Sequence, residues 1–143
     1  MKRDPMPDET ATMQIGELAD RTEMSLRTIR HYDEVGLLTP SGRSEGGFRL
    51  YTHDDYLRLM VIRRMKPLGF SLDEMAELLR VVDALDRGPA GGAGADDEGD
   101  GRVQATRASL AAFVDETVER RAKLERQLAM ADEFLELLRA RLR

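Results

Sequence analysis

Short segments of helical periodicity, each bounded by turn or capping residues, make up most of the first 87 residues. Their pattern predicts a first helix over about 16–21 and a second over 26–35, joined by a turn. Ser25 suits the N-cap of the second helix, and Gly36 suits its end. The residues expected to face the core from the second helix are Leu26, Ile29 and Val35. Two short helices in this order predict a helix-turn-helix.

A glycine pair predicts a β-hairpin after these helices. Residues 43–45 and 48–51 flank Gly46-Gly47, which favours a tight two-residue turn. Two capping-box patterns, Thr52-x-x-Asp55 and Ser71-x-x-Glu74, predict a third and a fourth helix. Pro67 and Gly69 are expected to end the third helix. The expected core residues of the two helices are Leu57, Val61 and Met65, then Leu72, Met75, Leu78, Leu79 and Val82.

The last forty residues carry a heptad repeat, with apolar positions alternately four and three residues apart. This pattern predicts one long helix from about 104 to 142 that pairs with the same helix of a second copy. The alternative is a helix that folds back on its own globular part. The residues expected at the dimer interface are Leu110, Val114, Thr117, Arg121, Leu124, Leu128, Ala131, Leu135, Leu138 and Leu142.

A break in composition separates these two parts of the chain. Of the fourteen residues from Gly88 to Gly101, six are glycine and four are acidic, which is typical of a flexible linker. The predicted organisation is therefore a mobile tail (1–12), a globular domain (13–87), a linker (88–102) and a dimerisation helix (103–143).

Several classes of function are disfavoured by composition. The chain has no cysteine and only two histidines, without metal-ligand spacing, so we expect no metal and no cofactor. No 18-residue apolar run and no signal-peptide pattern occur, so we expect a cytoplasmic protein. The carboxylate pairs Asp54-Asp55 and Asp96-Asp97 fall at a helix start and in the linker, and we expect no enzymatic activity.

Charge is unevenly distributed. The net charge is −5, but the segment from Ser25 to Lys66 holds eight basic and five acidic side chains, a net charge of +3. A local basic surface of this kind predicts contact with nucleic acid. Arginines on the second helix suit a DNA major groove, and those of the hairpin suit the backbone beside it. The basic residues of these groups are Arg27, Arg30, Arg43, Arg49, Arg63, Arg64 and Lys66.

The sequence resembles the N-terminal domain of the MerR family of bacterial transcription regulators. The resemblance rests on IGELA from Ile15, on SLRTIRHYDEVGLL from Ser25 and on GGFRLY from Gly46. It continues through IRRM from Ile62 and LGFSLDEM from Leu68, so it covers about 75 residues in order.

The resemblance implies a mainly α-helical protein: a winged helix-turn-helix with a small β-hairpin wing, followed by a long helix that forms an antiparallel coiled coil in a homodimer. It implies that the dimer binds a near-palindromic site in double-stranded promoter DNA and distorts the spacer so that RNA polymerase can engage. A contact between Tyr32 and phosphate is also carried over from the family. With the residues from the charge analysis, the full expected set is Ser25, Arg27, Thr28, Arg30, His31, Tyr32, Arg43, Phe48, Arg49, Tyr51, Arg63 and Lys66.

Two alternatives stay open: an architectural or recombination accessory factor without promoter control, and a protein-interaction module. Metal and redox sensors of the family use cysteines, and this chain has none. The resemblance therefore does not identify an effector. A crevice lined by Met75, Leu79, Phe113 and Phe134 is a candidate effector site, although the same residues suit a core.

Overall fold

The computed structural model describes residues 11–87 and 97–143 of the chain. The chain divides into two compact units, Met1–Ala76 and Glu77–Arg143. The division falls inside a helix rather than at its end.

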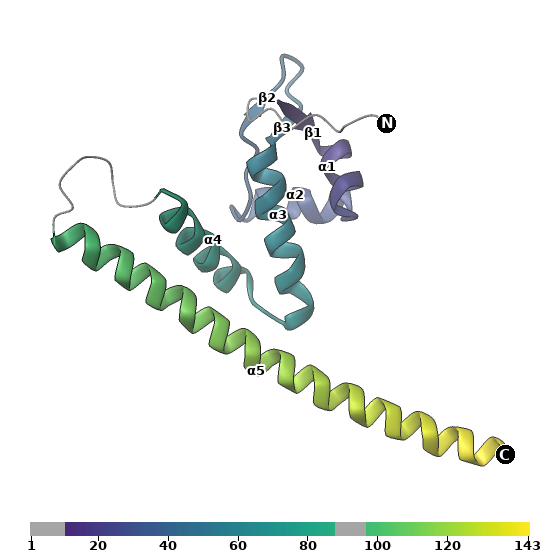
Figure 1. The fold of residues 1–143 in the computed structure, drawn as a ribbon. Helices are drawn as coiled ribbons and strands as arrows, with labels where there is room; N and C mark the ends of the chain where they lie inside the picture. Colours follow the sequence, from purple (N-terminus) through teal and green to yellow (C-terminus); the bar gives the residue numbers. More distant parts are fainter. Residues whose placement is uncertain (1–10, 88–96) are drawn as a thin grey trace, which may run out of the picture. The chain divides into compact units, whose positions relative to one another are not determined.

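The first unit contains a three-stranded antiparallel sheet (Figure 1). Its strands are β1 (Thr12–Gln14), β2 (Gly42–Arg43) and β3 (Arg49–Thr52), in the order β1-β3-β2. Met13 faces Tyr51 across the β1–β3 pair, and Arg43 faces Arg49 across the β2–β3 pair. The predicted tail was therefore wrong at Thr12, which begins a strand; positions 1–10 lie outside the described residues.

Four helical segments complete this unit. They are α1 (Ile15–Thr22), α2 (Leu26–Glu34), α3 (His53–Met65) and the short 3-10 helix η1 (Lys66–Leu68). The next helix, α4 (Leu72–Arg87), begins in this unit and continues into the second. The mainly α-helical fold with a helix-turn-helix and a small β-sheet wing is confirmed.

The core of the first unit draws one or two side chains from each main element. Its fully buried members are Leu18, Ile29, Tyr51, Leu59 and Ile62. Expected core positions on α2, α3 and α4 were partly wrong: Leu26, Val35, Leu57 and Leu72 are 39%, 48%, 49% and 38% exposed. Leu72 is the first residue of α4. Leu26 and Val35 stand at the ends of α2, and α3 is apolar on two adjacent faces, so periodicity alone did not select the buried one.

The second unit contains the rest of α4 and one helix of 46 residues, α5 (Asp97–Leu142). At about 1.5 Å per residue, α5 is about 70 Å long. It begins six residues before the predicted dimerisation helix, so positions 97–102 of the predicted linker are helical. Gly99 and Gly101 weaken a helix by about 1 kcal/mol each but do not break one of this length. Linker positions 88–96 lie outside the described residues.

Apolar side chains are exposed along α5 within a single chain. The larger ones are Val114, Val118, Leu124, Leu128, Met130, Phe134, Leu135, Leu137, Leu138 and Leu142. Across residues 11–87 and 97–143, no helix combines the length and the apolar character needed to cross a bilayer.

Candidate nucleic-acid interface

The N-cap and the buried face of α2, the second helix of the helix-turn-helix, together leave two arginines and a histidine exposed to solvent. Ser25 Oγ accepts a hydrogen bond from the Thr28 amide at 3.1 Å and lies 2.8 Å from Thr28 Oγ1. Ile29 and Tyr32 are buried, and this orientation leaves Arg27, Arg30 and His31 exposed. Gly36, at φ +76°, follows the helix end, as predicted.

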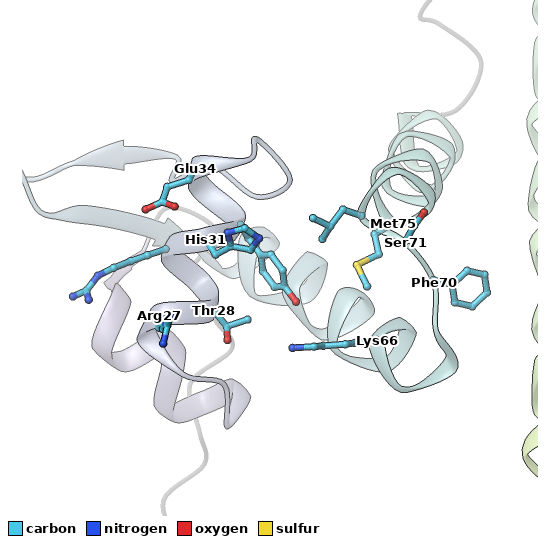
Figure 2. A pocket seen from close by; sticks show the side chains of 11 residues that line it. Arg27, Thr28, His31, Glu34, Lys66, Phe70, Ser71 and Met75 are labelled. Atoms are coloured by element: carbon cyan, nitrogen blue, oxygen red, sulfur yellow. The ribbon is translucent and has the colours of Figure 1, made fainter. Parts of the chain in front are cut away.

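A groove of about 950 Å³ runs between α2 and the start of α4 (Figure 2). Lys66, from η1, extends its amine toward α2 across this groove. The capping box of α4 fixes the far side, since the Ser71 amide donates to Glu74 and the Glu74 amide donates to Ser71. The lining residues are Arg27, Thr28, Arg30, His31, Tyr32, Glu34, Lys66, Phe70, Ser71, Leu72 and Met75.

Two tyrosines from the expected interface are core residues. Tyr32 is 3% exposed, and burial raises the pKa of its hydroxyl, but it still lines the groove. Tyr51 is fully buried, and its hydroxyl has no hydrogen-bond partner among residues 11–87 and 97–143. The expected DNA contact of Tyr51 is therefore wrong, because alternation along β3 turns its side chain into the core.

The wing is the β2–β3 hairpin, and its turn is wider than predicted. The Ser44 amide donates to Phe48 O and the Gly47 amide donates to Ser44 O, which makes a three-residue loop with Gly47 at φ +81°. This is the usual place for glycine in such loops, so the predicted two-residue turn is wrong. Arg43 Nη1 donates to Gly47 O at 3.0 Å, and Phe48 is 62% exposed at the tip.

Two arginines of the expected set are engaged in ion pairs. Arg49 Nε donates to Asp33 Oδ2 at 2.8 Å, and this hydrogen bond is the main cause that raises the pKa of the Arg49 guanidinium. Arg63 Nη2 donates to Glu23 Oε2 at 2.9 Å. The structure therefore brings together Arg27, Thr28, Arg30, His31 and Lys66 around the groove, and gives Arg49 and Arg63 intramolecular partners.

The groove also contains residues that sequence analysis did not place there. Glu34, Phe70, Ser71, Leu72 and Met75 line it. The capping box at Ser71 was a visible signal for the start of α4, but nothing in the local pattern placed that start opposite α2. Across the described ranges, no cluster of three or more side chains suited to a metal ion occurs.

The expected dimer-interface residues all lie on α5. Leu110 and Thr117 are partly exposed and the other eight are exposed. Thr117 donates to Phe113 O at 2.7 Å, and Arg121 pairs with Glu125 at 2.9 Å. Their pairing with a second copy stays a prediction. So does the effector crevice, because Met75 belongs to the first unit and Leu79, Phe113 and Phe134 to the second.

Helix-turn-helix, wing and basic groove together define a winged helix-turn-helix protein. Residues 13–81 match the model of the MerR HTH family regulatory protein. This match assigns residues 13–81, about half of the chain, to the MerR family.

Two regulators and one solved structure are similar to this chain. The mercuric resistance operon regulatory protein of Bacillus cereus is 46% identical over 69 residues, which are 48% of this chain and 52% of that protein. The regulator ZntR of Escherichia coli K12 is 48% identical over 67 residues, which are 47% of this chain and 48% of that one. The matches thus span about half the length of these relatives. The lead-bound crystal structure of PbrR691 from Ralstonia metallidurans is 33% identical, with a TM-score of 0.47, and covers 89% of this chain and 86% of that one.

Proposed function

We propose that this chain is a sequence-specific DNA-binding regulator of transcription, active as a homodimer on a near-palindromic promoter site. The observation that carries the proposal is the groove beside α2, whose lining includes exposed Arg27, Arg30 and His31 together with Lys66. An α-helix with such side chains on its exposed face fits a major groove, and cations beside it fit phosphates. The relatives named above are themselves described as regulators.

The second copy would be supplied through α5. Its exposed heptad positions would be buried by an identical helix, and the resulting two-fold axis would present two copies of α2 to two half-sites. Contacts with both half-sites would offset the free energy of deforming the DNA between them, which is roughly 1–6 kcal/mol. Such a regulator would act in the cytoplasm, without enzymatic activity, and with RNA polymerase as its partner at the promoter.

The test begins with selection of a site from random duplexes by the full chain. Binding to that site is then measured by fluorescence anisotropy at several salt concentrations. Arg27→Ala and Arg30→Ala should each weaken binding by about 1–3 kcal/mol if the side chain reads a base. Arg80→Ala is the control, because Arg80 is not among the residues that line the groove and pairs with Glu77 at 2.6 Å. If both single variants and the double variant bind with wild-type affinity, the assignment of α2 to the DNA interface is wrong.

A transcription assay separates regulation from an architectural role. With purified bacterial RNA polymerase and a promoter that contains the selected site, the protein should change transcript yield. Specific binding and DNA bending without any change in yield would favour the architectural alternative instead.

A further inference from the structure

One ion pair connects the last turn of α2 to the base of the wing. Arg49 Nε lies 2.8 Å from Asp33 Oδ2, and the two side chains are only 27% and 17% exposed. Asp33 is three residues beyond Arg30, which is one helical turn. Arg49 faces Arg43 across the β2–β3 pair, next to the wing loop.

The pair is less exposed than the Arg21–Glu17 and Arg63–Glu23 pairs of the same unit. Arg21–Glu17 lies within one helix, and its side chains are 51% exposed. The Asp33–Arg49 pair joins two elements sixteen residues apart, and its Asp33 carboxylate is the less exposed partner. A shielded, charge-assisted hydrogen bond of this kind restricts geometry more than an exposed pair does.

We propose that Arg49 is a positioning residue rather than a DNA contact, and that Asp33 and Arg49 together set the wing relative to α2. The proposal rests on the proposed function, since the geometry matters only if both elements grip one duplex. Loss of Asp33 would leave the cations of α2 and the wing in place but disturb their mutual orientation.

Asp33→Asn separates this role from a direct contact, because the two roles predict opposite signs. If Arg49 contacts phosphate, removing the Asp33 charge releases the guanidinium for DNA and reduces repulsion, so binding strengthens. If the pair positions the wing, Asp33→Asn weakens binding about tenfold, as expected for the loss of one charge-assisted hydrogen bond. The matched control is Glu34→Gln, which removes an acidic charge one residue further along, at the edge of the groove. That variant should bind DNA slightly more tightly.

The full chain and its selected DNA site serve for the measurement, with affinity recorded against salt. The expected result is similar weakening in Asp33→Asn, Arg49→Gln and the double variant, with the salt dependence of wild type. Lys66→Gln, at a proposed phosphate contact, should instead reduce the slope of log K against log salt by about 0.9. Hydrogen exchange in the free protein gives a second readout: Asp33→Asn should accelerate exchange in residues 42–50 and leave α1 unchanged.

Two results would overturn the proposal. One is unchanged or tighter binding by Asp33→Asn; the other is a smaller salt slope in Arg49→Gln together with unchanged exchange in the hairpin of Asp33→Asn. Failure of wild type to prefer any site over random competitor would instead refute the proposed function, and the hairpin exchange would still report whether the pair holds the wing.

Discussion

Glu23 and Arg63 hold the turn of the helix-turn-helix against α3, with 2.9 Å between Arg63 Nη2 and Glu23 Oε2. Glu23 is also the C-cap of α1. Its φ is 56°, and among the residues that the structure describes it is the one non-glycine residue with positive φ. An L-residue in the left-handed region costs roughly 1–2 kcal/mol, so the turn combines backbone strain with an exposed ion pair.

We predict that removing the strain outweighs losing the pair. Glu23→Gly should raise the free energy of unfolding by about 0.5 kcal/mol, because relief of strain exceeds the entropy that glycine adds to the unfolded chain. Glu23→Gln keeps the strain and should change it by less than about 0.5 kcal/mol, since both side chains are exposed. Urea unfolding measures both variants, and a destabilised Glu23→Gly would show that the pair dominates.

Asp55 connects the loop before β2 to the capping box of α3. Its carboxylate is buried and accepts from Ser41 Oγ at 2.6 Å and from the Thr52 amide at 2.8 Å. Asp55→Ala should lower the free energy of unfolding by about 2 kcal/mol, because two donors lose their acceptor. Asp54→Ala is the control, since Asp54 is exposed in the same first turn and should cost less than about 0.5 kcal/mol. Equal losses in thermal unfolding of the two variants would contradict this role.

Because the Tyr51 hydroxyl is buried, we expect the stability of the protein to fall at alkaline pH. Burial is the main cause that raises the pKa of its hydroxyl above the ordinary value of 10.0, and the nearby Asp33 carboxylate adds to the effect. The neutral form is therefore favoured in the folded state, and this stability is fully present below about pH 10 and is lost as pH rises toward the folded pKa. Above pH 10, the free energy of unfolding of Tyr51→Phe should fall less steeply with pH than that of wild type. Urea unfolding at a series of pH values measures this. At pH 7 this variant should be at least as stable as wild type, because the Tyr51 hydroxyl forms no hydrogen bond within the described part of the chain.

The features predicted correctly from sequence are those fixed by neighbours in the chain. The capping boxes at Thr52 and Ser71, the Ser25 N-cap and the Gly36 helix end each depend on residues within a few positions. The arginines of α2 followed from the same logic, because helical spacing alone separates Arg27 and Arg30 from Ile29.

The features missed depend on contacts between distant segments. The β1 strand exists because it pairs with β3, almost forty residues away. Tyr51 and Arg49 were both expected at the interface because aromatic and basic residues suit a wing. Only the packing of β3 shows that one enters the core and the other meets Asp33.

The heptad pattern of α5 makes a prediction that a matched pair of variants can test. Leu128 and Met130 are 63% and 67% exposed in the single chain, but only Leu128 occupies a heptad position. If α5 pairs with a second copy, Leu128→Asp buries a charge in the interface and should shift the protein toward monomer at micromolar concentration. Met130→Asp should remain dimeric, because its side chain lies off the heptad positions. Sedimentation equilibrium measures both, and a monomeric wild type, or dissociation by both variants alike, would contradict the predicted interface.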